Sequence, residues 1–185
     1  PLMDTTFDLL IKNGIITTDT VAETSDIGVK NGKISEIGDL ASRKTKNIID
    51  ARHLHILPGI IDSQVHFREP GNEHKENMET GSRAAVLGGV TSVFEMPNTH
   101  PSTTTVELFD DKLTRAQGRY HCDYGFFIGA SEENALNLSK LETLPSCVGV
   151  KIFMGSSTGT LLIPEDNTLR KVLASGNLSK RSSRE

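Results

Sequence analysis

The stretch Leu57-Pro-Gly-Ile-Ile-Asp-Ser-Gln-Val-His-Phe-Arg-Glu-Pro-Gly71 decides how the rest of the sequence is interpreted. Its apolar start predicts a buried strand, which follows a Pro-Gly turn. Successive side chains of a strand point to opposite faces, so alternate polar residues are expected together on one face. These residues are Asp62, Gln64, His66 and Arg68. An acid, an amide, an imidazole and a guanidinium at the end of a strand predict the floor of an active site.

The same stretch resembles the Asp-x-His-x-His-x-Arg-x-Pro-Gly motif of dihydroorotases, which belong to the cyclic amidohydrolase superfamily. One position departs from that motif, because Gln64 stands where the family has its first metal-binding histidine. The resemblance extends from about residue 7 to about residue 174. It implies a hydrolase that reversibly opens the ring amide of dihydroorotate to give carbamoyl aspartate, a step of pyrimidine biosynthesis.

Residues 1–56 predict a small β-sandwich segment, because short apolar runs are separated by turn-forming residues. Asn13-Gly14 and Asn31-Gly32 are typical of tight hairpin turns. We expect a strand to end at the first of these turns and two strands to flank the second.

Residues 57–175 predict an α/β fold, a partial TIM-type (β/α) barrel built of about four βα units. We expect helices over 79–87 and 164–174, a helix that begins with a capping box of Thr104 and Glu107, and a helix that begins at Ser131. A complete barrel needs roughly 250 residues. The segment therefore predicts the amino-terminal half of a barrel, from a truncated or frameshifted reading of a longer gene. Residues 176–185 are polar and predict a disordered tail.

Three side chains are candidate metal ligands: His66, Gln64 and Lys151. An imidazole suits zinc, whereas the amide oxygen of Gln64 is a weaker donor. The site could hold one tight metal ion, hold none, or belong to an adapted subgroup. Apolar neighbours of Lys151 suggest burial that lowers the pKa of its amine. The resemblance implies one or two zinc ions, with Lys151 carboxylated to a bridging carbamate.

Two further side chains are candidates for substrate binding, Arg68 and Asn98. A guanidinium pairs with a carboxylate through two parallel hydrogen bonds, and dihydroorotate carries one carboxylate. Asp62 is expected to orient a ligating imidazole. Each residue also has a plain structural interpretation: a surface ion pair for Arg68, a turn for Asn98, and a bond to local backbone for Asp62.

The resemblance implies that the catalytic aspartate and two further metal-binding histidines lie on later strands, beyond this chain. We therefore expect no ring opening by the chain alone. Two alternatives remain open. One is a non-catalytic relic, or a dihydroorotase-like scaffold that supports a partner such as a transcarbamoylase, and the other is a hydrolase of the allantoinase or hydantoinase type. A homo-oligomer is also among the expected assemblies.

The composition of the chain argues against several other classes of function. A formal net charge of −4, without a basic cluster, argues against binding to nucleic acid. No run approaches the ~20 apolar residues of a membrane span, and the first residues do not resemble a secretory signal. Cys122 and Cys147 lack the spacing of a disulfide framework. These features predict a soluble, cytoplasmic protein. The small-molecule substrate, dihydroorotate or carbamoyl aspartate, is implied by the resemblance alone.

Overall fold

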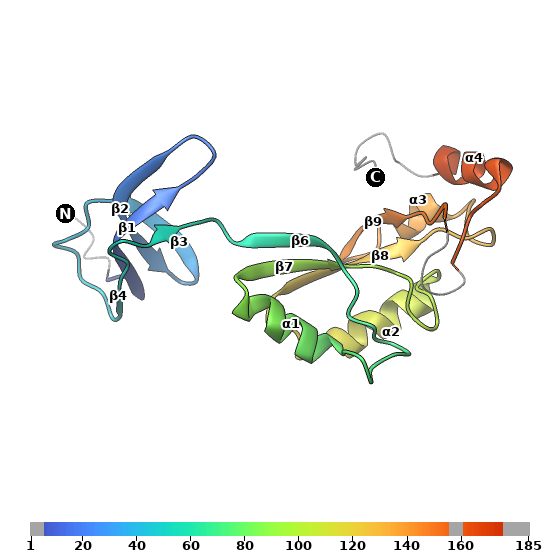
Figure 1. Ribbon diagram of the computed structural model, residues 1–185, viewed down its shortest axis with the longest axis horizontal. Helices are drawn as coiled ribbons and strands as arrows, with labels where there is room; N and C mark the ends of the chain where they lie inside the picture. The colour runs from blue at the N-terminus through green and yellow to red at the C-terminus, as the bar shows by residue number, and fades with distance from the viewer. Residues whose placement is uncertain (1–5, 156–160, 176–185) are drawn as a thin grey trace. The chain divides into compact units, whose positions relative to one another are not determined.

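The computed structural model describes residues 6–155 and 161–175. The chain separates at Pro58 and Gly59 into two compact units (Figure 1). The tail predicted for residues 176–185 lies outside the described residues. No helix in the described part is long and apolar enough to cross a membrane.

The first unit is β-rich, as the sequence predicts. Its strands are β1 (Leu9–Thr17), β2 (Ala22–Lys30), β3 (Lys33–Gly38), β4 (Ile48–Asp50) and β5 (His55–Ile56). Among the described residues they form one five-stranded sheet in the order β3-β2-β1-β4, with β5 also paired to β1. Strands β1, β2 and β3 are antiparallel neighbours, whereas β4 and β5 run parallel to β1.

The two Asn-Gly pairs of this unit behave differently. Asn31 and Gly32 have φ of 51° and 72° and connect β2 to β3 as a two-residue hairpin turn, as predicted. The turn predicted at Asn13 is wrong, because β1 continues through it to Thr17. Asn13 has φ of 63° at a shift in the register with β2, and its backbone N–H donates to Asp26 Oδ1 at 2.8 Å. The pair therefore forms a bulge within a strand, a second use of a residue that tolerates positive φ.

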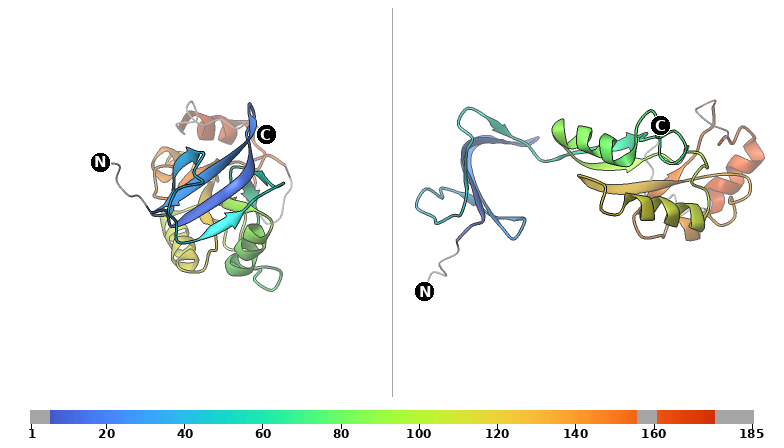
Figure 2. Two further views of the ribbon diagram at one scale, coloured as in Figure 1. Left: turned by 90° about the vertical axis from the view of Figure 1, so that its left-hand side faces the viewer. Right: turned by 90° about the horizontal axis from the view of Figure 1, so that it is seen from below.

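The second unit contains the predicted half-barrel. Its elements are β6 (Ile60–Val65), α1 (Met78–Leu87), β7 (Val90–Glu95), α2 (Val106–Ala116), β8 (Asp123–Gly129), α3 (Leu138–Leu141), β9 (Cys147–Lys151) and α4 (Asp166–Ser175). In the described ranges, β6, β7, β8 and β9 form a parallel sheet of four strands in chain order. The sheet is curled, and α1 and α2 lie on the same face of it (Figures 1 and 2). The partial barrel predicted from the sequence is thereby confirmed.

Apolar residues between the sheet and the helices form the core of this unit. Phe126 and Ile128 of β8 pack with Phe109 of α2, and all three side chains are fully buried. A smaller cluster joins Val65 and Phe67 to the strand β7 beneath α1. These contacts fix the sheet against its helices and leave the strand ends to carry polar groups.

Three local expectations for this unit are corrected. The start of β6 is not buried as expected, because Ile60 and Ile61 are 52% and 59% exposed and the described residues cover neither side chain; β6 is an edge strand of the described sheet. Thr105, not Thr104, caps α2 by accepting from Leu108 N at 3.3 Å. The chain at Ser131 forms a turn, with its N–H bound to the side chain of an asparagine three residues later, and α3 begins only at Leu138.

Candidate active site

The carboxyl ends of the four parallel strands meet at one edge of the curled sheet. Active sites of barrel enzymes lie at this edge. His66 directly follows β6, Asn98 comes three residues after the end of β7, and Lys151 is the last residue of β9. The described part of the chain therefore brings polar groups from three separate segments to the edge where barrel chemistry occurs.

A bulge in β6 decides which of its side chains share a face. Asp62 pairs with Val93 and Val65 pairs with Glu95, so three steps along β6 match two along β7. The register sets Asp62 on the face of the buried Val93, and not with His66. The sequence predicts that side chains alternate between the two faces along the whole strand. This prediction is wrong at the bulge, where the alternation is interrupted.

The first two polar residues of the motif, Asp62 and Gln64, lie at the surface. Asp62 Oδ1 accepts the backbone N–H of Gln64 at 3.1 Å. Such a bond to local backbone is the plain structural interpretation of an aspartate at this position. The orienting role of Asp62 and the metal-binding role of Gln64 stay predictions.

His66 is half-buried among cationic side chains. Burial lowers the pKa of its imidazole, and the charge of Arg68 lowers that pKa further. A hydrogen bond with the Asn98 side chain opposes these effects, while the charges of Lys151 and Lys112 add to them. The neutral imidazole is thus favoured, which is the form that binds a metal ion.

Arg68 is held in an uncommon backbone conformation. Its φ is 55°, and its carbonyl oxygen accepts the N–H of Asn72 at 2.9 Å. The next residue, Glu69, is 4% exposed and accepts two hydrogen bonds from the guanidinium of Arg119, at 2.7 and 2.9 Å. Glu69 Oε2 also accepts the N–H of Met78 at the start of α1. These bonds anchor the loop that carries Arg68.

The carboxylate of Glu69 is charged in this setting. Burial raises its pKa, but the hydrogen bonds from Arg119 and from the N–H of Met78 outweigh burial, and the net pKa is lowered. A charged Glu69 keeps Arg119 engaged in the anchor of this loop. The substrate-binding role of Arg68 stays a prediction.

Lys151 is half-buried, and its Nζ lies 5.6 Å from the centre of the Phe153 ring. Its backbone carbonyl accepts the N–H of Ala130, which joins the ends of β8 and β9. Its positive charge lowers the pKa of the His66 imidazole, so the two predicted ligands interact electrostatically. Carboxylation of Lys151 stays a prediction.

The donors at this edge fit part of a metal site. A catalytic zinc ion takes three protein ligands and an open position. Residues 6–155 and 161–175 contain no group of three His, Cys, Asp or Glu side chains that could hold a metal ion. His66 supplies one imidazole, and a carboxylated Lys151 would supply a hard oxygen donor. The described residues therefore fit one side of such a centre.

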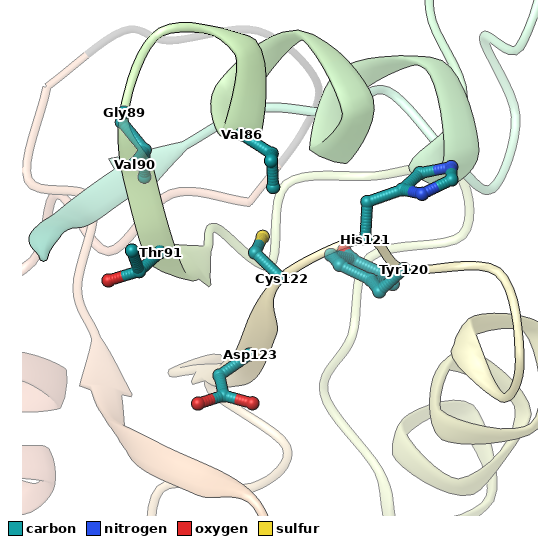
Figure 3. Close-up of a pocket in the computed structure, with 8 residues that line it drawn as sticks. All are labelled: Val86, Gly89, Val90, Thr91, Tyr120, His121, Cys122 and Asp123. Atoms are coloured by element: carbon teal, nitrogen blue, oxygen red, sulfur yellow. The ribbon is translucent and has the colours of Figure 1, made fainter. Parts of the chain in front are cut away.

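A hollow with a volume of about 480 Å³ lies at the opposite, amino-terminal edge of the strands (Figure 3). It is lined by Val90 and Thr91 of β7, by Cys122 just before β8, and by Asp123, the first residue of β8. Burial raises the pKa of the Cys122 thiol, and the nearby Asp123 raises it further. The thiol is a weak nucleophile there, and the hollow is not a candidate for the hydrolytic site.

The sequence interpretation missed a buried polar network behind the site. It comprises Glu95, Lys112 and Tyr120, from the end of β7, from α2 and from the loop after α2. The signal was the position of Lys112 in α2, three residues after Phe109 and four before Ala116, both of which are fully buried. A lysine at core spacing predicts either a buried charge or an error in the helix assignment.

A curled parallel half-barrel with His66 and Lys151 at the carboxyl ends of its strands has the architecture of part of a (β/α)-barrel enzyme. Residues 55–152 match the model of the amidohydrolase family, and the chain belongs to that family.

The similar proteins within this family include allantoinases and a hydantoinase. An allantoinase of Deinococcus radiodurans is 35% identical over 153 residues, which are 81% of this chain and 34% of that protein. An allantoinase of Salmonella newport is 38% identical over 151 residues, 81% of this chain and 33% of that protein. The L-hydantoinase of Arthrobacter aurescens has a TM-score of 0.84 at 29% identity, over 90% of this chain and 37% of that one. The chain thus spans about a third of the length of the relatives it matches.

Proposed function

We propose that this chain carries the amino-terminal part of the active site of a cyclic amide hydrolase of the allantoinase and hydantoinase type. The observation that carries the proposal is that His66 follows the end of β6, Asn98 follows the end of β7, and a side-chain hydrogen bond joins the two residues. Family membership and the names of the similar proteins support a ring amide as the substrate.

In this proposal each side chain has a separate task. His66 and a carboxylated Lys151 would hold the metal ion, which when bound supplies Lewis acidity for the attack of water on the ring amide. Arg68 orients the substrate through a carboxylate or carbonyl oxygen, because its guanidinium donates in a fixed planar fork. Asn98 holds His66 by its hydrogen bond and offers a second polar contact to the ring.

Dihydroorotase activity is the second candidate. It is supported by the presence of Arg68 and Asn98 near His66, because the charge of Arg68 and a hydrogen bond with the Asn98 side chain both act on that imidazole. Dihydroorotate carries a carboxylate that this pair could bind, whereas hydantoin does not. Both candidates share one reaction, the hydrolysis of an amide bond within a ring.

A split-enzyme assay tests the proposal. The chain is mixed with the separately produced carboxyl-terminal part of the Deinococcus radiodurans allantoinase, in the presence of zinc. We expect ring opening of allantoin or hydantoin at least tenfold above the buffer rate, and loss of that turnover in His66→Ala. Faster turnover of dihydroorotate, lost in Arg68→Ala, would support the second candidate instead.

The matched control mixes the same carboxyl-terminal part with the amino-terminal part of the allantoinase itself. If that pair opens allantoin and the mixture with this chain opens none of the three rings, the hydrolase proposal is wrong. A non-catalytic relic or scaffold would then be the better account of the chain.

A further inference from the structure

A buried pair of charged side chains lies behind the turn that carries Asn98. Lys112 and Glu95 are each 1% exposed, and Lys112 Nζ lies 3.7 Å from Glu95 Oε1. The same Nζ donates to the backbone carbonyl oxygen of Met96 at 3.1 Å and lies 5.3 Å from the centre of the Phe126 ring. A carboxylate, a carbonyl and an aromatic face therefore surround the ammonium inside the protein.

Packing alone does not account for this pair. Replacing a buried ion pair by apolar residues of similar volume is often neutral or stabilising. The two charged groups are in contact without a hydrogen bond, because the 3.7 Å between Lys112 Nζ and Glu95 Oε1 is too long for one. Glu95 Oε1 has no hydrogen-bond partner among the described residues. The close polar contact of the ammonium is its bond to the Met96 carbonyl.

Met96 links three segments through its two backbone groups. Its N–H donates to the carbonyl of Val65, the residue before His66, at 2.9 Å. Its carbonyl accepts from Lys112 of α2. Asn98 follows two residues later, is 8% exposed, and bonds to the imidazole of His66. The orientation of the Met96 peptide therefore determines the position of the Asn98 backbone, from which the side chain reaches His66.

We propose that Lys112 is a positioning residue of the ring-amide site, which holds the Met96 carbonyl and thereby fixes Asn98 against His66 and the substrate. The inference rests on the proposed function for what Asn98 does there. Glu95 supplies the opposite charge beside the buried ammonium. Tyr120 keeps Glu95 in place, because its hydroxyl donates to Glu95 Oε2 at 3.1 Å.

The order of the Asn98 side chain tests this role without an activity assay. Its side-chain amide signal is identified by its loss in Asn98→Ala, and its order parameter is measured by NMR relaxation. We expect the order parameter to fall by about 0.2 or more from its wild-type value in Lys112→Met and in the double variant Lys112→Met/Glu95→Gln. The double variant contains no unpaired buried charge, so it reports on position even where the single variant fails to fold.

Lys140→Met is the matched control, because it makes the same chemical change at an exposed lysine of α3. It should leave the order parameter of Asn98 unchanged. An unchanged value in the folded double variant would overturn the positioning role, whatever the split-enzyme assay gives. A loosened Asn98 together with no ring opening would uphold that role and overturn the hydrolase proposal alone.

Discussion

Replacing Lys112 by methionine is expected to lower the free energy of unfolding of the barrel unit by about 3–5 kcal/mol at pH 8. The change removes the partner of Glu95, whose side chain is 1% exposed. Burial raises the pKa of Glu95 to about 7 even though the Lys112 charge lowers it. Without that charge, a buried carboxylate would remain in the folded chain with the Tyr120 hydroxyl as its side-chain donor.

The same substitution should cost far less at low pH. An ordinary glutamate has a pKa of 4.5, so the folded chain holds the proton of Glu95 more tightly than the unfolded chain does. The resulting stability is complete below pH 4.5 and is lost as the pH rises through the higher pKa of the folded state. The loss approaches about 1.4 kcal/mol for each pH unit in that range. We therefore expect the cost of Lys112→Met to grow steadily between pH 5 and pH 8.

Lys112 itself shifts in the opposite sense in the wild-type chain. Burial lowers the pKa of its ammonium, although Glu95 opposes that effect. An unfolded lysine then binds more protons than the folded one, and this makes stability rise with pH. The two shifts partly offset each other in the wild type, so removal of Lys112 exposes the pH dependence of Glu95.

Urea denaturation at pH 5 and pH 8 measures both effects. In Lys112→Met/Glu95→Gln we expect stability within about 1 kcal/mol of the wild type and no additional pH dependence, because neither partner is charged. Lys140→Met provides the baseline for losing an exposed lysine. Equal destabilisation by Lys112→Met at both pH values would show that Glu95 is not a charged partner of Lys112.

The half-barrel could be predicted because its determinants are local. The helix expected over 79–87 is observed at Met78–Leu87, where Asn77 caps the start and Gly88 follows the end. Strand β7 is observed at Val90–Glu95, directly after the Gly88-Gly89 pair that ends the helix. Apolar periodicity and glycine stops identify such elements without knowledge of their neighbours.

The site was harder to predict because its geometry depends on pairing between strands. The bulge in β6 arises from its register with β7, and nothing in Asp62-Ser-Gln64 marks it. Asn13 shows the same limit, since one dipeptide serves a turn or a bulge according to the partner strand. The buried Lys112 could be noticed from its spacing, but its partner Glu95 lies 17 positions earlier, on another element.

Gln64→His is expected to tighten zinc binding by the chain by tenfold or more, about 1.4 kcal/mol or greater. Gln64 is exposed and precedes His66 by two residues, roughly 7 Å along an extended chain. Imidazole is a stronger zinc donor than an amide oxygen, so the change would add a second nitrogen ligand beside a neutral His66. Competition with a chromophoric chelator at pH 7.5 measures the dissociation constant.

Ile61→His is the matched control for this prediction, because it adds an imidazole to the same exposed edge strand at 59% exposure. Position 61 is about 16 Å from His66 along the strand, too far for both imidazoles to bind one ion. The double variant Gln64→His/His66→Ala should lose the gain. If Gln64→His binds zinc no more tightly than Ile61→His does, then position 64 does not lie at the metal site, and the motif at the end of β6 cannot supply two ligands to one ion.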